Sequence, residues 1–175
     1  WELVKDIDDP WRKIVIKNAM GEFSAHLKCF DEALLHYEEA ILGLKSIDNQ
    51  YARTAVLINM AHCYLETQDI ESSKEYYIEA LKTIVHIPYM LPLGLATLAG
   101  FSRILISEGK YEDASKLVGL VINNPYGYHD SRRMAKVAIQ QIQQYLDMDT
   151  FNALAMHYTM DKYYDILASL ISNKQ

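Results

Sequence analysis

Four side chains that can ligate zinc occur in the first half of the chain: His26, Cys29, His62 and Cys63. They would meet if two helical hairpins stacked on one another. Structural zinc sites usually show Cys-x-x-Cys or His-x₃-His pairs, and the chain has neither. Two buried thiols and two histidines on helix faces are the simpler interpretation. We therefore expect no metal and no cofactor.

Nucleophilic catalysis needs a Ser or Cys next to a His that a carboxylate orients. The chain has no Gly-x-Ser-x-Gly elbow, and its six histidines are scattered. The adjacent acids Glu38-Glu39 and Glu112-Asp113 are typical of exposed helix charges. The sequence therefore predicts that the chain is not an enzyme.

A small basic cluster, formed by Arg132, Arg133 and Lys136, is the best candidate for a phosphate contact. No recognisable nucleic-acid motif surrounds it, and the formal net charge of the chain is −6. We expect a solvated helix face there and no contact with nucleic acid.

The most apolar stretch runs from residue 84 to residue 106 and includes Pro88, Pro92 and Arg103. A loop followed by a buried helix explains it better than a membrane span, so we expect no membrane contact. The two cysteines fit a reducing compartment, which favours a cytoplasmic location. The chain opens without an initiator Met or a signal-peptide pattern, and we expect it to be a piece of a longer protein.

The elements that would position any site are helices. Apolar residues recur at helical spacing along the whole chain, as in Trp11, Val15, Ala19 and Phe23, and no clear strand pattern appears. Glycine and proline, which strand-rich folds need in their turns, are scarce at 7 and 4 residues. The pattern predicts an all-α fold.

Helix ends are marked by capping residues and turns. Asp31, Asp69 and Asp130 are expected to cap helix starts, and Gly109 is expected to close a helix in the left-handed conformation. The segment 123–127, Asn-Asn-Pro-Tyr-Gly, is the strongest turn signal. A helix over 131–146 and two short helices within 151–158 and 160–171 are expected after it.

Three segments share one pattern of small and bulky residues, and they recur at a step of about 40 residues. In each, a small residue is followed four positions later by a bulky one and seven positions later by another apolar one. The matched sets are Ala33, Tyr37, Ala40; Ser73, Tyr77, Ala80; and Ala114, Val118, Val121. A large–small pair stands at the same distance before each small residue: Met20-Gly21, Met60-Ala61 and Phe101-Ser102. Small residues let helices approach closely while bulky ones fill the groove beside them, so the pattern indicates repeated helical hairpins.

This pattern, over roughly residues 14–125, resembles the tetratricopeptide-repeat family. Tyr64 stands at the aromatic position of the first helix, whereas Ser24 and Leu105 replace it in the other repeats. The tryptophan that the family places early in the first helix is absent, and the period is longer than the family's usual length of about 34 residues. The resemblance implies a right-handed array of antiparallel hairpins that binds a partner on its concave side.

The C-terminal part resembles the helical-repeat tail of bacterial signalling ATPases and transcriptional activators. The residues that carry this resemblance are 98–103, 109–114, the Asn124-Pro125 turn, the helix 131–146 and residues 151–154. It implies an arm of a larger regulator. The chain has no P-loop, so we expect no nucleotide bound through one.

The repeat register predicts which residues line the concave groove, because the first helix of each hairpin faces it in a stacked array. The predicted partner-binding residues are Asn18, Glu22, His26, Asn59, His62, Glu66, Arg103 and Ser107. Some relatives hold a peptide carboxylate with basic and amide groups, but Glu22, Ala96 and Gly100 stand where that scheme needs such groups. A polar peptide or a small polar ligand suits the lining better, and the alternative is that these side chains only face water.

The resulting hypothesis has three parts: a lead-in over 1–13, three tetratricopeptide-like repeats over 14–125, and capping helices over 126–175. The predicted function is a protein-interaction or ligand-sensing arm of a larger bacterial signalling or transcription regulator, without chemistry of its own. The alternative is a free-standing scaffold that forms a homodimer when its N-terminal hairpin stacks on another copy.

Overall fold

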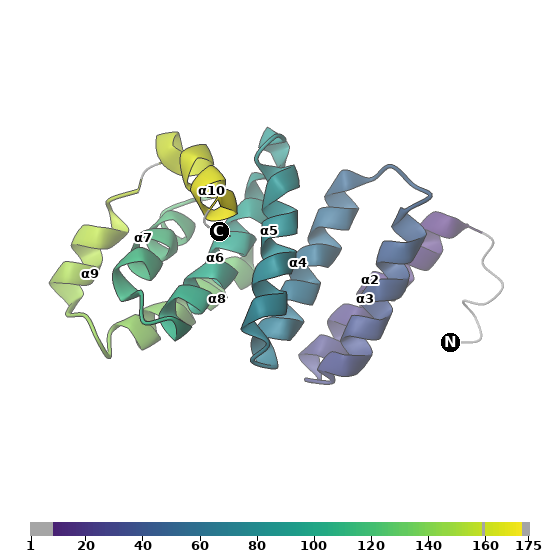
Figure 1. Cartoon of the computed structure of the whole chain (residues 1–175), viewed down its shortest axis with the longest axis horizontal. Helices are drawn as coiled ribbons and strands as arrows, with labels where there is room; N and C mark the ends of the chain where they lie inside the picture. Colours follow the sequence, from purple (N-terminus) through teal and green to yellow (C-terminus); the bar gives the residue numbers. More distant parts are fainter. Residues whose placement is uncertain (1–8, 159, 173–175) are drawn as a thin grey trace. The chain divides into compact units, whose positions relative to one another are not determined.

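The computed structural model describes residues 9–158 and 160–172, and over these residues it contains helices and no strand (Figure 1). The all-α prediction is confirmed. The α-helices are α2 (Pro10–His26), α3 (Phe30–Leu44), α4 (Gln50–Glu66), α5 (Ile70–Ile84), α6 (Leu91–Ser107), α7 (Tyr111–Ile122), α8 (His129–Ile142), α9 (Met148–Ala155) and α10 (Tyr163–Ser172). Short 3₁₀ helices, η1 (Pro88–Met90) and η2 (Met160–Lys162), precede α6 and α10.

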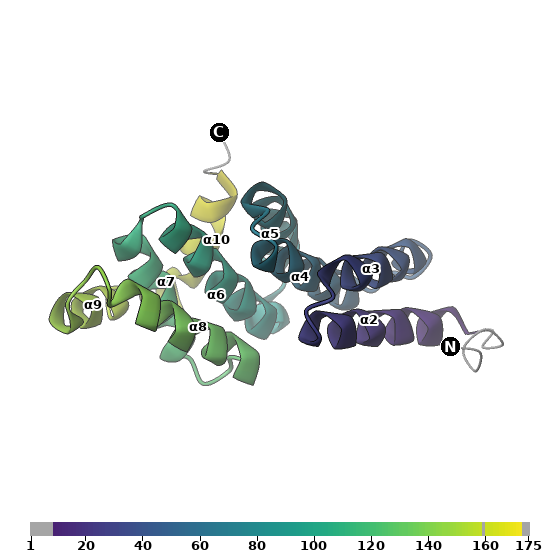
Figure 2. The ribbon, with the colours of Figure 1, turned by 90° about the horizontal axis from the view of Figure 1, so that it is seen from below.

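The chain divides into two compact units, Trp1–Tyr76 and Tyr77–Gln175, with the boundary inside α5. In unit 1, α3 packs along both α2 and α4 (Figure 1). In unit 2, α7 and α8 both pack against α6, and α9 packs against α7 (Figure 2). The first helix begins at Pro10, inside the predicted lead-in. The other predicted boundaries, which follow the repeats, stay a prediction.

The same turn closes the first helix of three successive helix pairs. Lys28, Gln68 and Gly109 all have positive φ, at 62°, 65° and 74°, and their spacing matches the step of about 40 residues predicted from the sequence. The next backbone N–H donates to the carbonyl five residues earlier: Cys29 to Ser24 (2.9 Å), Asp69 to Tyr64 (2.9 Å) and Lys110 to Leu105 (2.8 Å). This is the Schellman closure of a helix C-terminus. The prediction for Gly109 is confirmed, and two non-glycine residues take the same conformation.

Asp9 and Asn49 cap the N-termini of α2 and α4 and are separated by one repeat step. The Asp9 carboxylate accepts from the Trp11 backbone N–H at 2.9 Å, and the Asn49 side-chain oxygen accepts from that of Ala52 at 2.9 Å. Each bond satisfies a donor that has no partner inside the helix, so both helices begin at defined residues.

Of the three predicted aspartate caps, one is confirmed. The Asp69 carboxylate accepts from the Ser72 backbone N–H at 3.1 Å at the start of α5. Asp31 and Asp130 lie in the first turns of α3 and α8, whose N-cap residues are Cys29 and Tyr128. The capping prediction was wrong for these two, because each helix begins slightly earlier than the sequence signal. A carboxylate in the first turn still interacts favourably with the helix dipole.

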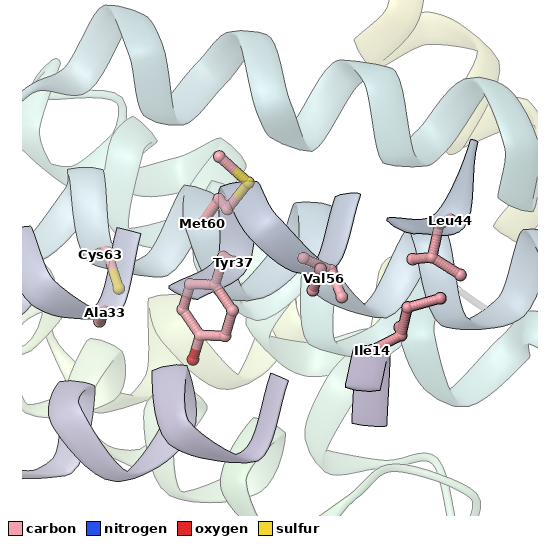
Figure 3. Packing of buried hydrophobic residues seen from close by; sticks show 8 residues of the cluster. Ile14, Ala33, Tyr37, Leu44, Val56, Met60 and Cys63 are labelled. Carbon is pink, nitrogen blue, oxygen red and sulfur yellow. The ribbon is translucent and has the colours of Figure 1, made fainter. Parts of the chain in front are cut away.

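The core of unit 1 lies where α3 meets α2 and α4. The buried cluster comprises Ile14, Ala33, Tyr37, Ala40, Leu44, Val56, Met60 and Cys63 (Figure 3). The Tyr37 ring points toward α2, where a Cβ built on Gly21 would lie only 2.5 Å from a ring carbon (Figure 3). The small residue at position 21 therefore makes room for the bulky one, as the sequence pattern predicts for this pair.

Unit 2 is built around α6. Among the described residues, Pro88–Ser107 is the one helical stretch long and apolar enough to cross a membrane, and 67% of its most apolar window is buried. That burial is typical of a core helix, and the predicted loop followed by a buried helix is confirmed. Pro92 lies in the first turn of α6, where its missing N–H costs no hydrogen bond.

The predicted turn at 123–127 separates α7 from α8 and is fixed by a buried asparagine and an arginine. The side-chain oxygen of Asn124, which is 3% exposed, accepts from the Tyr126 backbone N–H at 2.9 Å. Arg132 Nη2 donates to the carbonyl oxygens of Asn124 and Pro125 at 2.9 and 2.8 Å. The helix predicted over 131–146 begins at His129, just after this turn, and ends at Ile142.

Candidate partner-binding surface

The predicted groove residues of unit 1 lie on one face of α2 and one face of α4. On α2, residues 11, 15, 18, 22 and 26 share a helix face by their spacing, and on α4 residues 51, 55, 59, 62 and 66 do the same. We call these ten residues the α2/α4 face. The C-terminal ends of α2 and α4 lie close together, since Lys28 and Thr67 line a common depression. The middles of the two helices are also close, since Asn59 donates a hydrogen bond to Asn18, so the helices run in the same direction.

A hydrogen-bonded network joins the two helices in the middle of the α2/α4 face. Asn18 Nδ2 donates to Glu22 Oε1 at 2.8 Å. Asn59 Nδ2 donates to Asn18 Oδ1 at 3.4 Å and to Glu22 Oε1 at 3.3 Å. The structure therefore brings together three of the predicted residues from two distant parts of the sequence. Asn18 and Asn59 are 41 positions apart in the sequence, close to the predicted step of about 40 residues.

The remaining predicted residues of unit 1 flank this network. His26 Nδ1 contacts the backbone carbonyl oxygen of Glu22 at 2.7 Å, and a carbonyl only accepts, so Nδ1 carries the hydrogen. His62 is half-buried and Glu66 is exposed on α4. All of these groups lie toward the C-terminal ends of their helices, and this end of the face is therefore polar.

The opposite end of the α2/α4 face is apolar, and sequence reasoning did not assign it to the binding surface. Trp11 is 40% exposed, Val15 46% and Tyr51 36%. The i, i+4 stripe that starts at Trp11 thus faces solvent, whereas α2 contacts α3 through its other side, which includes Ile14 and Gly21. One sequence signal could have revealed this exposure. The large–small pair Met20-Gly21 marks the packed side of α2, and the stripe that starts at Trp11 lies on a different side of the helix.

The two predicted residues of the third repeat belong to unit 2. Arg103 is half-buried on α6, and Ser107 is exposed near the C-terminus of that helix. The Ser107 hydroxyl donates to the backbone carbonyl oxygen of Ile104 at 2.7 Å. Arg103 and Ser107 thus belong to a different compact unit from Asn18, Glu22 and Asn59.

The metal-capable side chains do not form a cluster. Among residues 9–158 and 160–172, no three His, Cys, Asp or Glu side chains lie close enough to hold an ion. Cys63 is buried in the unit 1 core, and this burial raises the pKa of its thiol to about 11. Cys29 is exposed at the turn before α3, so the expectation of two buried thiols was wrong for Cys29.

A shallow, open depression of about 340 Å³ lies beside the turns that follow α2 and α4. Lys28, Cys29, Phe30, Asp31, Glu32 and Thr67 line it. Sites for small ligands are concave and cover most of the ligand. An open depression lined largely by charged and polar residues does not have that form, which favours an extended partner over a small enclosed one.

The basic cluster at 132–136 is only partly a solvated helix face. Arg132 is half-buried and binds the carbonyl oxygens of the preceding turn, so it is committed to the fold. Arg133 is exposed and lies 3.3 Å from the Asp130 carboxylate, and Lys136 is exposed. The expectation of a solvated face was wrong for Arg132, because sequence spacing does not reveal a partner in the turn.

Comparisons with known proteins return no relative: no family model, no curated protein and no solved structure matches this chain. Its function is therefore inferred from its own residues and their geometry.

Proposed function

We propose that this chain is a tetratricopeptide-like helical-repeat module that binds a protein or peptide partner on the α2/α4 face. The observation that carries the proposal is the recurrence of one Schellman turn at residues 28, 68 and 109. Equal turns at nearly equal steps favour three equivalent hairpins, α2–α3, α4–α5 and α6–α7. Stacked hairpins place their first helices on a common side.

The packing of buried residues supports the same arrangement. The small residues Ala33, Ser73 and Ala114 are all completely buried, and so are the bulky Tyr77 and Val118, with Tyr37 at 2% exposure. In this proposal the array is right-handed, and α8, α9 and α10 cover the apolar side of its last hairpin. The contacts of α8 and α9 with α7 support this capping role.

A larger context follows from the sequence resemblance of the C-terminal part. In this proposal the module is an arm of a cytoplasmic signalling or transcription regulator, and a bound partner shifts how the arm sits against the rest of that protein. The module itself performs no chemistry. The network of Asn18, Glu22 and Asn59 supports a recognition role, because it is polar, crosses two helices and is accessible.

A peptide-library selection tests the proposed function. Immobilised chain selects binders from random displayed peptides, and the selected peptides are then measured against variants by fluorescence anisotropy. We expect the double variant Asn18→Ala, Asn59→Ala to weaken binding about tenfold, and Asn152→Ala, an exposed asparagine on α9, to leave it unchanged. Selected peptides that bind both variants equally would contradict the proposal.

One observation favours the scaffold alternative. Each α4 side chain that packs against α3 has a counterpart on α2, one repeat step earlier in the sequence. These α2 counterparts are not covered by another helix to the same extent. Val56, Met60 and Cys63 are at most 2% exposed, whereas Ile16 and Met20 are less buried and Phe23 is 66% exposed. In the scaffold alternative, this side of α2 is covered by another copy.

Size-exclusion chromatography with light scattering distinguishes the two candidates. A dimer that depends on concentration and is lost in Phe23→Glu supports self-association, because a charge on that surface is costly to bury. A monomer at all concentrations, with Phe23→Glu unchanged in size, supports the partner-binding module.

A further inference from the structure

The charged groups of the α2/α4 face are all acidic. Its ten positions include Glu22 and Glu66 and contain no Lys or Arg. The surrounding unit reinforces this sign: unit 1 contains 14 Asp and Glu against 8 Lys and Arg, whereas unit 2 contains 9 of each. The whole formal charge of −6 therefore belongs to unit 1, and the field at the face attracts cations.

The amide groups of the face are committed to its own carboxylate. Glu22 Oε1 accepts from the side-chain amides of both Asn18 and Asn59. These two bonds leave the second carboxylate oxygen of Glu22 able to accept a hydrogen bond from a ligand. An anionic ligand would have to displace Glu22 from its amides, whereas a cationic ligand adds to an arrangement already held in place.

The helix ends add to the same preference. The C-terminal ends of α2 and α4 lie at the polar end of the face, near Glu22, His26 and Glu66. A helix C-terminus carries a partial negative charge, which favours a cation nearby. Of the lysines of this region, Lys17 pairs with Glu39 on α3, and Lys28 lies beyond the end of α2 in the turn.

The apolar end of the face sets the second requirement on the ligand. Trp11, Val15 and Tyr51 expose apolar surface that a ligand side chain can cover. Val15 lies two helical turns before Glu22, which along the helix axis is about 10 Å. An extended peptide covers that distance in about three residues and a helical one in about seven.

We infer that the α2/α4 face binds a segment of a partner protein with an apolar side chain on Trp11, Val15 and Tyr51 and, about 10 Å away, a Lys or Arg on Glu22 and Glu66. This inference rests on the proposed function and names its partner class. The partner segment is a basic, amphipathic stretch of polypeptide and not a free C-terminal carboxylate.

Tryptophan fluorescence and anisotropy test the inference in the full 175-residue chain. The chain has two tryptophans, so Trp1→Phe leaves Trp11 as the only tryptophan emitter. The probes are three peptides capped at both ends, in which Leu stands three positions before Lys, Glu or Gln. We expect the Lys peptide to bind most tightly and to shift Trp11 emission to the blue as it covers the indole.

Charge variants then locate the basic side chain. Glu22→Gln and Glu66→Gln are each expected to weaken the Lys peptide about threefold and together about tenfold, with smaller losses at high salt. Glu71→Gln, an exposed carboxylate on α5, is the matched control and is expected to change the affinity little.

The outcomes separate this inference from the proposed function. Equal or tighter binding of the Glu or Gln peptide with a Trp11 shift overturns the basic partner class and leaves the binding surface in place. The inference is also overturned if neither glutamate variant weakens the binding of the Lys peptide. No Trp11 response to any of the three peptides overturns it as well, and the library selection then decides the proposed function independently.

Discussion

The helices α2 and α6 are both 17 residues long and both end in the same left-handed turn, yet their surroundings differ. Three residues of α2 are buried, whereas eleven residues of α6 are. In unit 2, α7 and α8 pack on α6, and the side chain of Tyr163 on α10 reaches Gly94. In unit 1, α2 packs mainly on α3. Two helices of equal length that end in the same turn therefore differ in role: α6 is a core helix of unit 2, and α2 is a largely exposed helix of unit 1.

The largest expected effect is a difference in the free energy of unfolding between two phenylalanine substitutions, one on α6 and one on α2. Phe101 on α6 is 3% exposed and lies 5.7 Å from Tyr77 between ring centroids, whereas Phe23 on α2 is 66% exposed. Phe101→Ala is expected to lower the free energy of unfolding by about 3–5 kcal/mol. Phe23→Ala should change it by no more than about 0.5 kcal/mol. Urea denaturation followed by circular dichroism measures both, and equal losses would contradict the comparison.

A smaller loss is expected where two backbones meet in unit 2. A Cβ built on Gly119 of α7 would lie 2.0 Å from the carbonyl oxygen of Ala155 on α9. Gly119→Ala is expected to destabilise the chain by about 1–3 kcal/mol, because a backbone cannot yield as a side chain can. Gly127→Ala provides the control, since its Cβ would meet no atom closer than 3.7 Å. A larger loss for Gly127→Ala would show that α7 and α9 do not pack this closely.

Substitutions at the three left-handed turn residues are expected to change the stability of the fold in opposite directions. Gly109 has φ 74°, and a Cβ added there would meet no atom within 4 Å, so Gly109→Ala should cost about 1 kcal/mol through backbone strain alone. Lys28 and Gln68 have the same conformation with a side chain, so Lys28→Gly and Gln68→Gly should stabilise by several tenths of a kcal/mol. Thermal melts of the three variants measure this. Destabilisation by both glycine substitutions would show that the turns are not equivalent.

The smallest expected effect is a pH dependence at two helix caps, one in each unit. Hydrogen bonds from Ser72 lower the pKa of Asp69, and hydrogen bonds from Thr150, first from its backbone N–H, lower the pKa of Asp147. Because the folded state holds these protons less tightly, each cap stabilises the fold above the ordinary pKa of 3.8 and loses its contribution as the pH falls through the lowered value.

Carboxyl carbon NMR titrations measure these two pKa values directly. Both midpoints are expected below 3.8. Asp69→Asn and Asp147→Asn keep an acceptor oxygen without the charge, and the acid-induced loss of stability should be smaller in each. Midpoints at or above the ordinary value would contradict the capping geometry.

The sequence predicted those features that are local or periodic. The helical class, the turn after α7 and the left-handed Gly109 all follow from spacing and residue type, whereas the hydrogen bond between Asn18 and Asn59 was not predicted. Lys28 and Gln68 were missed as left-handed residues, because glycine is the residue that most clearly signals that conformation in a sequence. Their equivalence to Gly109 appears once the repeat step is applied to the turns.

Features that depend on which surface is covered were not predictable. The stripe from Trp11 to Phe23 has the spacing of a core face but is largely exposed, since periodicity identifies a face without showing what packs on it. Arg132 likewise looked like part of a basic patch, and its two carbonyl partners are brought near by the fold of the turn. Sequence reasoning thus assigned polar residues of the α2/α4 face to the candidate site and did not assign its apolar end.

An NMR structure determination tests the repeated hairpin most directly, through the backbone torsion angles at residues 28, 68 and 109 and the proton contacts between Asn18 and Asn59. Left-handed angles are expected at all three positions, together with direct contacts between the two asparagine side chains. Three unlike turns, or an α2 remote from Asn59, would contradict the repeated hairpin.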